Sequence, residues 1–292
     1  MTDVPHLDGK CDGAVYYRKW SAESPRAQVL VLHGFGEHTG HYHRLAAKLN
    51  PAGLEVWAPD HVGHGHTGGT PGMFADVDEL AANAASLLET MTRGTTLPVV
   101  VVGHSLGALT GALLALDPPT ELAGLVMTGA PLWGLPPETA GRTDLVMAAD
   151  EVYLDALDND PLGFDTASAE PNLWRALTEA GHTVRTQLPA LRLPVLMING
   201  ELDVFASPTK AAAFADGLQL GRAVCIPGGF HDIPNDLAHR QVASLIVEAA
   251  DEWCSLGRVG ESPVRSSSSA PPICGGATQF GVNDPHSGSD RA

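Results

Sequence analysis

The chain has 292 residues, 44% of them hydrophobic, and carries 17 Lys and Arg against 34 Asp and Glu, a formal charge of −17. This length suits one large α/β domain with an insertion, or two small domains, and allows a sizeable core. The acidic balance argues against nucleic acid as a partner, because no basic patch is present to attract a polyanion.

The amino-terminal segment MTDVPHLDGK has acidic residues and no apolar core, which argues against a secretory signal. Residues 97–116 form the longest apolar run, but His104, Ser105 and the two glycines of a turn interrupt it, so it is predicted as a strand followed by a helix. We therefore expect a cytoplasmic protein that makes at most transient contact with a membrane or micelle surface.

Strand-like and helix-like segments alternate along the chain. Short apolar runs that end in Gly or Pro turns are typical of strands, and apolar residues at helical spacing are typical of helices. The strand patterns lie at 14–20, 27–34, 54–60, 99–103, 122–131, 193–200 and 222–229, and the helical patterns at 41–49, 80–91, 109–116 and 242–253. The first strand is expected to be antiparallel. The alternation predicts an α/β fold with a mostly parallel central sheet and helices on both faces.

Residues 132–190 interrupt this alternation. They have no strand pattern but many large apolar residues, and a structureless loop of this length is improbable in a compact fold. We predict an inserted helical cap, or lid, with 1–131 and 191–254 forming the core; additional packing helices are the simpler alternative. Residues 255–292 are rich in Ser, Gly and Pro, which predicts a disordered tail.

Ser105 stands between two glycines in the stretch VVVVGHSLGALTG, residues 99–111. The four valines are typical of a strand buried on both faces, and the apolar residues after Gly107 recur at helical spacing. Ser105 is therefore predicted to lie on a sharp strand-to-helix turn that Gly103 and Gly107 permit. This is the G-x-S-x-G nucleophile elbow in the structural context that it requires.

A serine nucleophile needs an imidazole to take its proton and a carboxylate to orient that imidazole. After a nucleophile elbow the acid follows first in the chain and the histidine second. We predict that Asp203, in the turn after strand 193–200, is the acid, with Glu201 as the alternative. His231, in the last strand-to-helix loop, is predicted to be the base.

Two backbone N–H groups are needed to bind the negative charge that develops on the substrate oxygen. The first is predicted at Leu106, which follows the nucleophile at the start of its helix. The second is predicted at Phe35, after the His-Gly pair of HGFGEH that ends strand 27–34.

Seven of the thirteen histidines lie between His33 and His66. Imidazole is a common zinc ligand, but the glycines among these histidines indicate a loop and not a fixed helical or strand spacing. We expect the histidines to pack beneath the site, without a metal or other cofactor.

Five segments carry a family resemblance: HGFGEHTGHY (33–42), PDHVGHGHTGG (59–69), GHSLG (103–107), GELD (200–203) and FHDIPND (230–236). Over about residues 8–254 they resemble the motifs of the α/β-hydrolase superfamily, specifically its monoacylglycerol lipase and lysophospholipase group. The resemblance implies the α/β-hydrolase fold, no cofactor, and hydrolysis of a single fatty-acyl ester through an acyl-enzyme. It places Ser105, Asp203 and His231 in the catalytic triad and Phe35 and Leu106 at the oxyanion hole.

The segment 132–190 also bears on the substrate. Trp133, Tyr153, Phe164 and Trp174 are predicted to bind an acyl chain, which favours a small lipid ester such as monoacylglycerol over bulky triacylglycerol. A broad carboxylesterase acting on short or xenobiotic esters is the main alternative. Acidic cap residues leave a serine aminopeptidase open, and a non-catalytic binding protein is disfavoured because all three triad residues are present.

Overall fold

A computed structural model describes residues 5–12, 14–139, 142 and 144–256. Within these residues eight strands form one sheet in the order β1-β2-β4-β3-β5-β6-β7-β8. The strands are β1 (Leu7–Cys11), β2 (Val15–Trp20), β3 (Ala27–Leu32), β4 (Leu54–Pro59), β5 (Val99–His104), β6 (Gly124–Thr128), β7 (Pro194–Gly200) and β8 (Leu220–Ile226). β2 pairs antiparallel with β1 and β4, and all other neighbours are parallel. The predicted mostly parallel sheet is confirmed, and β1 is an addition that the sequence pattern missed.

Helices connect the strands in the predicted alternation. The α-helices are α1 (His43–Leu49), α2 (Val77–Thr92), α3 (Leu106–Leu116), α4 (Glu151–Asp158), α5 (Thr166–Gln187), α6 (Pro208–Asp216) and α7 (His239–Leu256). Short 3-10 helices are η1 (Thr39–Tyr42), η2 (Asn50–Ala52), η3 (Pro137–Thr139) and η4 (Leu188–Ala190).

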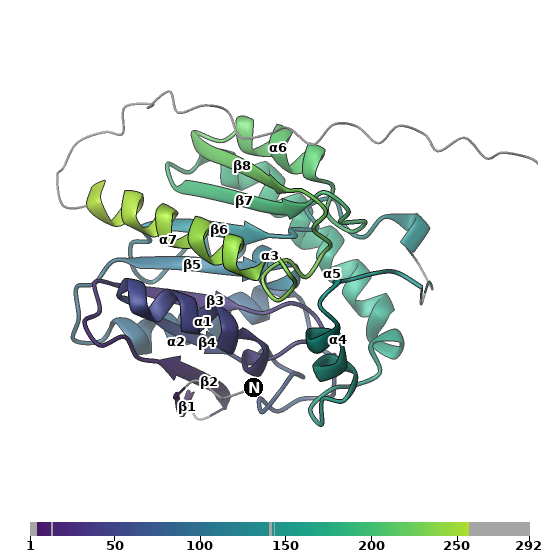
Figure 1. Cartoon of the computed structure of the whole chain (residues 1–292), viewed down its shortest axis with the longest axis horizontal. Helices are drawn as coiled ribbons and strands as arrows, with labels where there is room; N and C mark the ends of the chain where they lie inside the picture. The colour runs from purple at the N-terminus through teal and green to yellow at the C-terminus, as the bar shows by residue number, and fades with distance from the viewer. Residues whose placement is uncertain (1–4, 13, 140–141, 143, 257–292) are drawn as a thin grey trace, which may run out of the picture.

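The central strand β5 shows how the two faces of the sheet are covered. Val99 and Val101 join the apolar cluster of helices α2 and α3, whereas Val100 and Val102 join that of α1 and α7. Successive side chains of a strand point to opposite faces, so a strand between two helical layers must be apolar throughout. In Figure 1, α1 and α7 cross the face of the sheet nearer the viewer.

Residues 132–190, the segment for which a helical cap is predicted, contain η3, α4, α5 and η4. α4 lies beyond the carboxyl ends of the parallel strands, at the right of Figure 1. Leu173, Leu177 and Val184 of α5 belong to the same apolar cluster as α2 and α3. Ligands of parallel α/β sheets bind at the carboxyl ends of the strands, so this segment covers the end where a site is expected.

Helix α7 continues to Leu256. The tail predicted for 255–292 lies, from residue 257 on, outside the described residues. Among the helices that the structure describes, none has both the length and the apolar character needed to span a bilayer.

Candidate active site

Ser105 forms the turn between β5 and α3 with φ 51° and ψ −113°. Such a positive φ is unusual outside glycine and costs on the order of 1–3 kcal/mol. The turn also brings backbones into close contact: a Cβ at Gly107 would collide with the carbonyl oxygen of Leu32 in β3, and a Cβ at Gly103 with the carbonyl oxygen of Gly107. The two glycines that flank Ser105 therefore allow the strained turn that presents its hydroxyl at the end of the sheet.

The structure brings Ser105 together with the acid and the base predicted for it. His231 Nε2 lies 2.9 Å from Ser105 Oγ, and His231 Nδ1 lies 2.9 Å from both carboxylate oxygens of Asp203. Oδ1 of Asp203 also accepts hydrogen bonds from the backbone N–H groups of Phe205 and Ala206, both at 2.9 Å. These two bonds fix the carboxylate in the orientation that holds the imidazole against the hydroxyl.

Glu201, the alternative acid, does not contact His231. Its carboxylate accepts the backbone N–H of Gly228 at 2.9 Å. This bond joins the loop after β7 to the loop after β8, so Glu201 steadies the loop that carries His231. Of the two carboxylates, the geometry favours Asp203 as the partner of the base.

Burial and charge act in opposite directions on the pKa of His231. Burial alone would lower it, but the charge and hydrogen bond of Asp203, with smaller contributions from Asp232 and Glu37, raise the pKa of His231 to about 9. Burial alone would raise the pKa of Asp203, but His231 and the backbone donors hold that pKa below its usual value. The pair therefore favours an ionised carboxylate beside an imidazole that readily holds a proton, as a general base must.

The two predicted oxyanion donors flank Ser105. Leu106 is the first residue of α3, and Phe35 lies in the loop directly after β3. A Cβ built on Gly34, the neighbour of Phe35, would lie 3.5 Å from Ser105 Cβ, so this loop packs against the nucleophile. In the described part of the chain neither the Phe35 nor the Leu106 N–H donates to another protein group, which leaves both available to a substrate oxygen.

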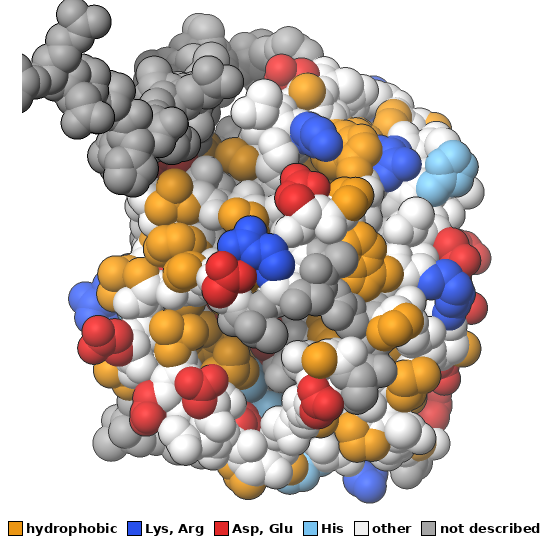
Figure 2. Space-filling view, turned by 90° about the vertical axis from the view of Figure 1, so that its right-hand side faces the viewer, with side chains coloured by type: hydrophobic (Ala, Val, Ile, Leu, Met, Phe, Trp, Pro, Cys, Tyr) orange, Lys and Arg blue, Asp and Glu red, His pale blue; other side chains and the backbone are white. Residues whose placement is uncertain are grey.

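A cavity of about 880 Å³ opens beside Ser105 and His231, within the size range of small-molecule sites. Much of its lining is apolar and comes from residues 132–190 together with the loop after β7. The large apolar residues in the lining are Phe35, Leu135, Leu145, Met147, Leu157, Phe164, Leu173, Leu177 and Phe205. Figure 2 views this end of the molecule, where hydrophobic side chains gather and acidic side chains lie among them.

Two of the four predicted acyl-binding residues, Tyr153 and Phe164, line this cavity, and Trp133 and Trp174 do not. Trp133 is 41% exposed, and its ring contacts Phe214 and the cations of Arg185 and Lys210 instead. α5 lines the cavity with Thr166 and Ala167 in its first turn and with Leu173 and Leu177, the last two about one helical turn apart. Trp174 follows Leu173 by one residue, about 100° around the helix from it, and is not part of the lining.

Glu37 is a buried junction that the sequence analysis did not identify. Its Oε2 accepts the Gly34 N–H and the Tyr42 hydroxyl, both at 2.7 Å. Its Oε1 lies 3.0 Å from the Tyr153 hydroxyl of α4 and 3.1 Å from Nδ2 of Asn235, in the loop after His231. One carboxylate thus joins three parts of the chain. These are the loop 34–41, called the oxyanion loop because it carries the predicted donor Phe35, the segment 132–190, and the loop that carries His231. The lone glutamate in the Gly- and His-rich segment HGFGEHTGHY (33–42) is the sequence signal that could have found it.

The charges around Glu37 explain why its carboxylate is ionised and why Tyr153 beside it keeps its proton. Burial would raise the pKa of Glu37, but the nearby imidazoles of His104 and His41 and the hydrogen-bond donors lower it to about 2. Burial and the negative charges of Glu37 and Asp232 raise the pKa of Tyr153 well above its usual value. Tyr153 therefore keeps its proton and can donate it to Glu37 or to Asp232, whose Oδ2 lies 3.2 Å away.

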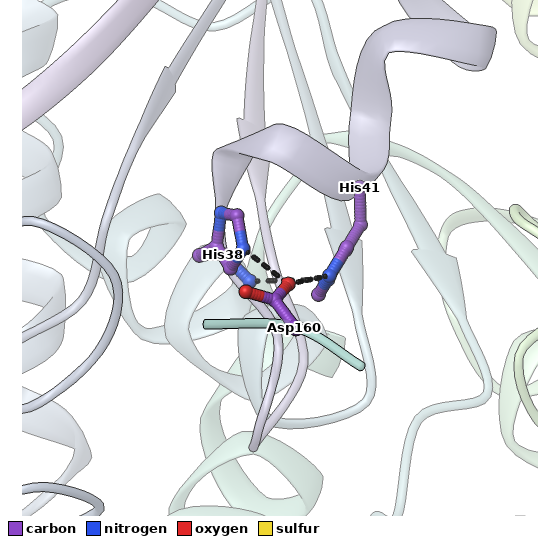
Figure 3. Close-up of side chains that lie close together, drawn as sticks. All are labelled: His38, His41 and Asp160. Carbon is purple, nitrogen blue, oxygen red and sulfur yellow. Dashed lines mark hydrogen bonds and ion pairs between the residues drawn. The ribbon is translucent and has the colours of Figure 1, made fainter. Parts of the chain in front are cut away.

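Two groups of described residues bring nitrogen and carboxylate oxygen atoms close enough to hold a metal ion. One consists of His104, His231 and Asp232, and includes the predicted base. The other consists of His38, His41 and Asp160, shown in Figure 3. In the loop 61–66, His61 and His64 are buried, whereas His66 is exposed and its ring centroid lies 4.7 Å from that of Tyr16. His61 donates its backbone N–H to His33 Nε2 at 2.9 Å, and burial lowers the pKa of both.

Comparisons with known proteins agree with this site. The family model described as "Serine aminopeptidase, S33" matches residues 23–147 and 135–238. Monoglyceride lipase of Homo sapiens is 32% identical over 69% of this chain and 73% of its own length. Monoacylglycerol lipase of Mycolicibacterium smegmatis is 26% identical over 82% of this chain and 92% of its own length.

A solved structure agrees with these relatives. The crystal structure of the Paleococcus ferrophilus monoacylglycerol lipase superposes with a TM-score of 0.69 at 25% identity, over 82% of this chain and 98% of that chain. The matched segments include the elbow and both loops that carry the acid and the base. The chain belongs to the α/β-hydrolase family, in the group that contains the monoglyceride lipases.

Proposed function

We propose that this chain hydrolyses esters of single fatty acids, with monoacylglycerols as the preferred substrates, and that Ser105 is the nucleophile. The observation that carries the proposal is the hydrogen-bonded series from Asp203 through His231 to Ser105 beside a large, mostly apolar cavity. The names of the relatives, monoglyceride and monoacylglycerol lipases, support the same class of substrate.

In the proposed reaction His231 Nε2 takes the proton of Ser105 Oγ as that oxygen forms a bond to the ester carbonyl carbon. The carbonyl oxygen becomes negative and accepts hydrogen bonds from the N–H groups of Phe35 and Leu106. When the intermediate collapses, the ester C–O bond breaks and His231 returns the proton to the leaving alcohol. A water molecule then attacks the acyl carbon as His231 takes its proton. The bond from that carbon to Ser105 Oγ breaks, His231 returns the proton to Oγ, and the fatty acid leaves.

The apolar lining supports a lipid acyl group as the bound part of the substrate. Each methylene taken out of water contributes about 0.8 kcal/mol, and the residues above the cavity offer aliphatic and aromatic contacts for several of them. We propose that 132–190 acts as a cap over this channel. Val146 and Val152 of this segment are 52% and 57% exposed, and this exposure supports transient contact with a lipid surface. That the chain acts in the cytoplasm stays a prediction.

A second candidate, aminopeptidase activity, draws on the acidic residues of the same cavity. Asp158 and Asp165 line it; Asp165 caps α5 by accepting the Ala167 N–H, so Asp158 is the candidate to hold a substrate amine. Two other acids of the segment are already engaged: Asp150 pairs with Arg44 at 2.6 Å, and Asp160 is bound by two histidines. The apolar majority of the lining favours the lipid ester.

The test compares kcat/KM across p-nitrophenyl esters of two to sixteen carbons below their critical micelle concentrations, with monoacylglycerols, triacylglycerols and amino-acid p-nitroanilides alongside. We expect a maximum at medium or long chains and preference for monoacylglycerol over triacylglycerol. A maximum at two to four carbons would instead identify a small-ester carboxylesterase. Turnover of the anilides with little ester hydrolysis would identify an aminopeptidase.

A further inference from the structure

Asp160, which follows α4, is bound by two histidines from a distant part of the chain. Its Oδ2 lies 2.7 Å from Nε2 of His38 and 2.7 Å from Nε2 of His41 (Figure 3). The side chains of His38, His41 and Asp160 are 10%, 8% and 9% exposed. Oδ1 of Asp160 accepts the backbone N–H of Leu162 at 2.8 Å, which fixes the carboxylate within its own loop.

The other ring nitrogen of each histidine decides where its proton lies. His38 Nδ1 accepts the Gly40 N–H at 3.0 Å, and His41 Nδ1 faces the His38 backbone N–H at 3.4 Å. An imidazole that accepts at Nδ1 carries its proton on Nε2. Both rings therefore donate to Asp160, whereas a metal ion would need a lone pair on the same Nε2 atoms. The Nε2 N–H groups of both histidines are therefore already used in hydrogen bonds to the Asp160 carboxylate.

Charges in the group agree with this arrangement. Burial, and then the neighbouring His41, lower the pKa of His38, which keeps the ring neutral. Burial would raise the pKa of Asp160, but the Leu162 N–H and the His38 and His41 donors hold it below its usual value. An ionised carboxylate that accepts from two ring N–H donors is a stable pairing in a nearly buried site.

Residues of the same segment, 132–190, hold the oxyanion loop at two further points. The Tyr153 hydroxyl of α4 lies 3.0 Å from Glu37 Oε1. The Phe164 ring packs edge-on against the Phe35 ring, with centroids 5.5 Å apart. Together with the Asp160 bonds, these contacts are spread along the loop from Phe35 to His41.

The amino-terminal end of the loop 34–41 lies against the nucleophile Ser105. Glu37 Oε2 accepts the Gly34 N–H at 2.7 Å, and Gly34 packs against Ser105. The N–H of Phe35 follows directly. A displacement of the loop at His38 and His41 would thus move a predicted oxyanion donor.

We propose that Asp160 is a positioning residue for the oxyanion hole: through His38 and His41 it holds the loop 34–41 so that the Phe35 N–H faces the ester oxygen. This inference rests on the proposed ester hydrolysis. It makes the chemical step depend on a residue of the cap even for an ester too short to fill the acyl channel.

The kinetic test uses p-nitrophenyl acetate and p-nitrophenyl dodecanoate with Asp160→Asn and Asp160→Ala. Loss of an oxyanion donor lowers kcat by about 100- to 1,000-fold, and we expect a misplaced donor to lower kcat on the acetate by at least about 10-fold, with KM changed little. The matched control is Asp155→Asn, which removes one exposed carboxylate from α4 and should leave kcat unchanged. An unchanged kcat on acetate, with only the KM for dodecanoate raised, would show that Asp160 merely shapes the acyl channel.

Substitutions of His41 test whether donation to Asp160 is the relevant property. The amide nitrogen of His41→Gln can still donate to Asp160 Oδ2, whereas His41→Leu cannot. We expect His41→Gln to retain most of kcat on the acetate and His41→Leu to lose it as Asp160→Ala does. Equal losses in the two variants would contradict the proposal.

A measurement without substrate separates this inference from the proposed function. Amide hydrogen exchange of segment 34–42 should be faster in Asp160→Ala than in the wild type and unchanged in Asp155→Asn. If the wild type hydrolyses no ester, the proposed function fails while the exchange result still tests the loop. Unchanged exchange would overturn the inference, as would a rise in melting temperature with ZnCl₂ that Asp160→Ala abolishes, because that result would identify a metal site.

Discussion

Both carboxylate oxygens of Asp203 lie 2.9 Å from Nδ1 of His231. The carboxylate therefore faces the edge of the imidazole and keeps the proton on Nδ1, so that Nε2 presents a lone pair to Ser105. The Asp203 side chain is fully buried and that of His231 is 4% exposed, so water does not compete for this pair. Predictions about the reaction follow from this contact and from the turn at Ser105.

Asp203→Asn should lower kcat by about 10⁴-fold, because an amide in this position favours the wrong tautomer of the base. The measurement is kcat on p-nitrophenyl butyrate. Glu201→Gln is the matched control, since Glu201 contacts the Gly228 backbone and not the imidazole. If Glu201→Gln lost activity and Asp203→Asn kept it, the acid would be Glu201.

Ser105 should be the residue that reacts with a fluorophosphonate probe. We expect labelling of the wild type and none of Ser105→Ala, read by intact-protein mass spectrometry. Circular dichroism of the variant serves as the check that the fold is intact. Labelling that persists in Ser105→Ala would place the nucleophile elsewhere.

The positive φ of Ser105 predicts a difference in stability between two inactive variants. Ser105→Gly and Ser105→Ala both lack the hydroxyl, but only glycine relaxes a backbone at φ 51°. We expect the free energy of unfolding of Ser105→Gly to exceed that of Ser105→Ala by about 1 kcal/mol, the strain relieved less the entropy that glycine adds to the unfolded chain. Urea denaturation measures it, and a less stable Ser105→Gly would show that the turn is unstrained.

The activity should rise with pH well above the ordinary range of histidine. His231 must be neutral to act as base, and its pKa is raised to about 9, so kcat/KM should increase up to about this pH. In Asp203→Asn the largest contribution that raises the pKa of His231 is gone, and the midpoint should move to lower pH. A wild-type midpoint below that of Asp203→Asn would contradict the assignment.

The same shift affects the stability of the fold. Because the pKa of His231 is higher in the folded state than its usual 6.5, its contribution is fully present below pH 6.5 and is lost as pH rises through about 9. Asp203 has a lowered pKa, so its contribution is present above its usual 3.8 and is lost as pH falls through the folded value. Unfolding measured from pH 6 to 10 should show a steeper loss in the wild type than in His231→Gln.

Chain-length preference should respond to the cavity lining. Leu157→Trp places a large side chain at a lining position of α4 and should lower kcat/KM on the dodecanoate ester by about 10-fold or more, equivalent to about two methylenes no longer buried. Turnover of the acetate should stay within about twofold. Leu154→Trp, on the same helix outside the lining, is the control. Equal effects of both substitutions would show that the acyl chain does not bind along this side of α4.

Local patterns predicted the elbow and the order of its partners because each depends on a few neighbouring residues. The valines of β5 and the glycines around Ser105 define the turn without reference to the rest of the fold. Asp203 and His231 follow from their places after β7 and β8. The order of elements therefore predicted the residues of the site that lie at the ends of strands.

Contacts made by residues 132–190 depend on tertiary packing, and no short pattern indicates them. His41 and Asp160 are 119 residues apart, and nothing in either segment shows that they meet. The assignment of Trp133 and Trp174 to the channel rested on residue type alone, but the direction of each side chain is set by how its segment packs on the sheet. Glu37 was overlooked because two of its four donors, Tyr153 and Asn235, lie 116 and 198 residues away.

The base is held by an edge strand of the sheet. His231 follows β8, which among the described strands pairs only with β7 and whose residues are mostly half-exposed, whereas Ser105 follows the fully buried β5. Edge segments open in local fluctuations at a lower free energy than the whole domain needs to unfold. Heating should therefore detach the base from the nucleophile while the centre of the sheet stays intact, so that activity is lost reversibly a few degrees before the global melting transition.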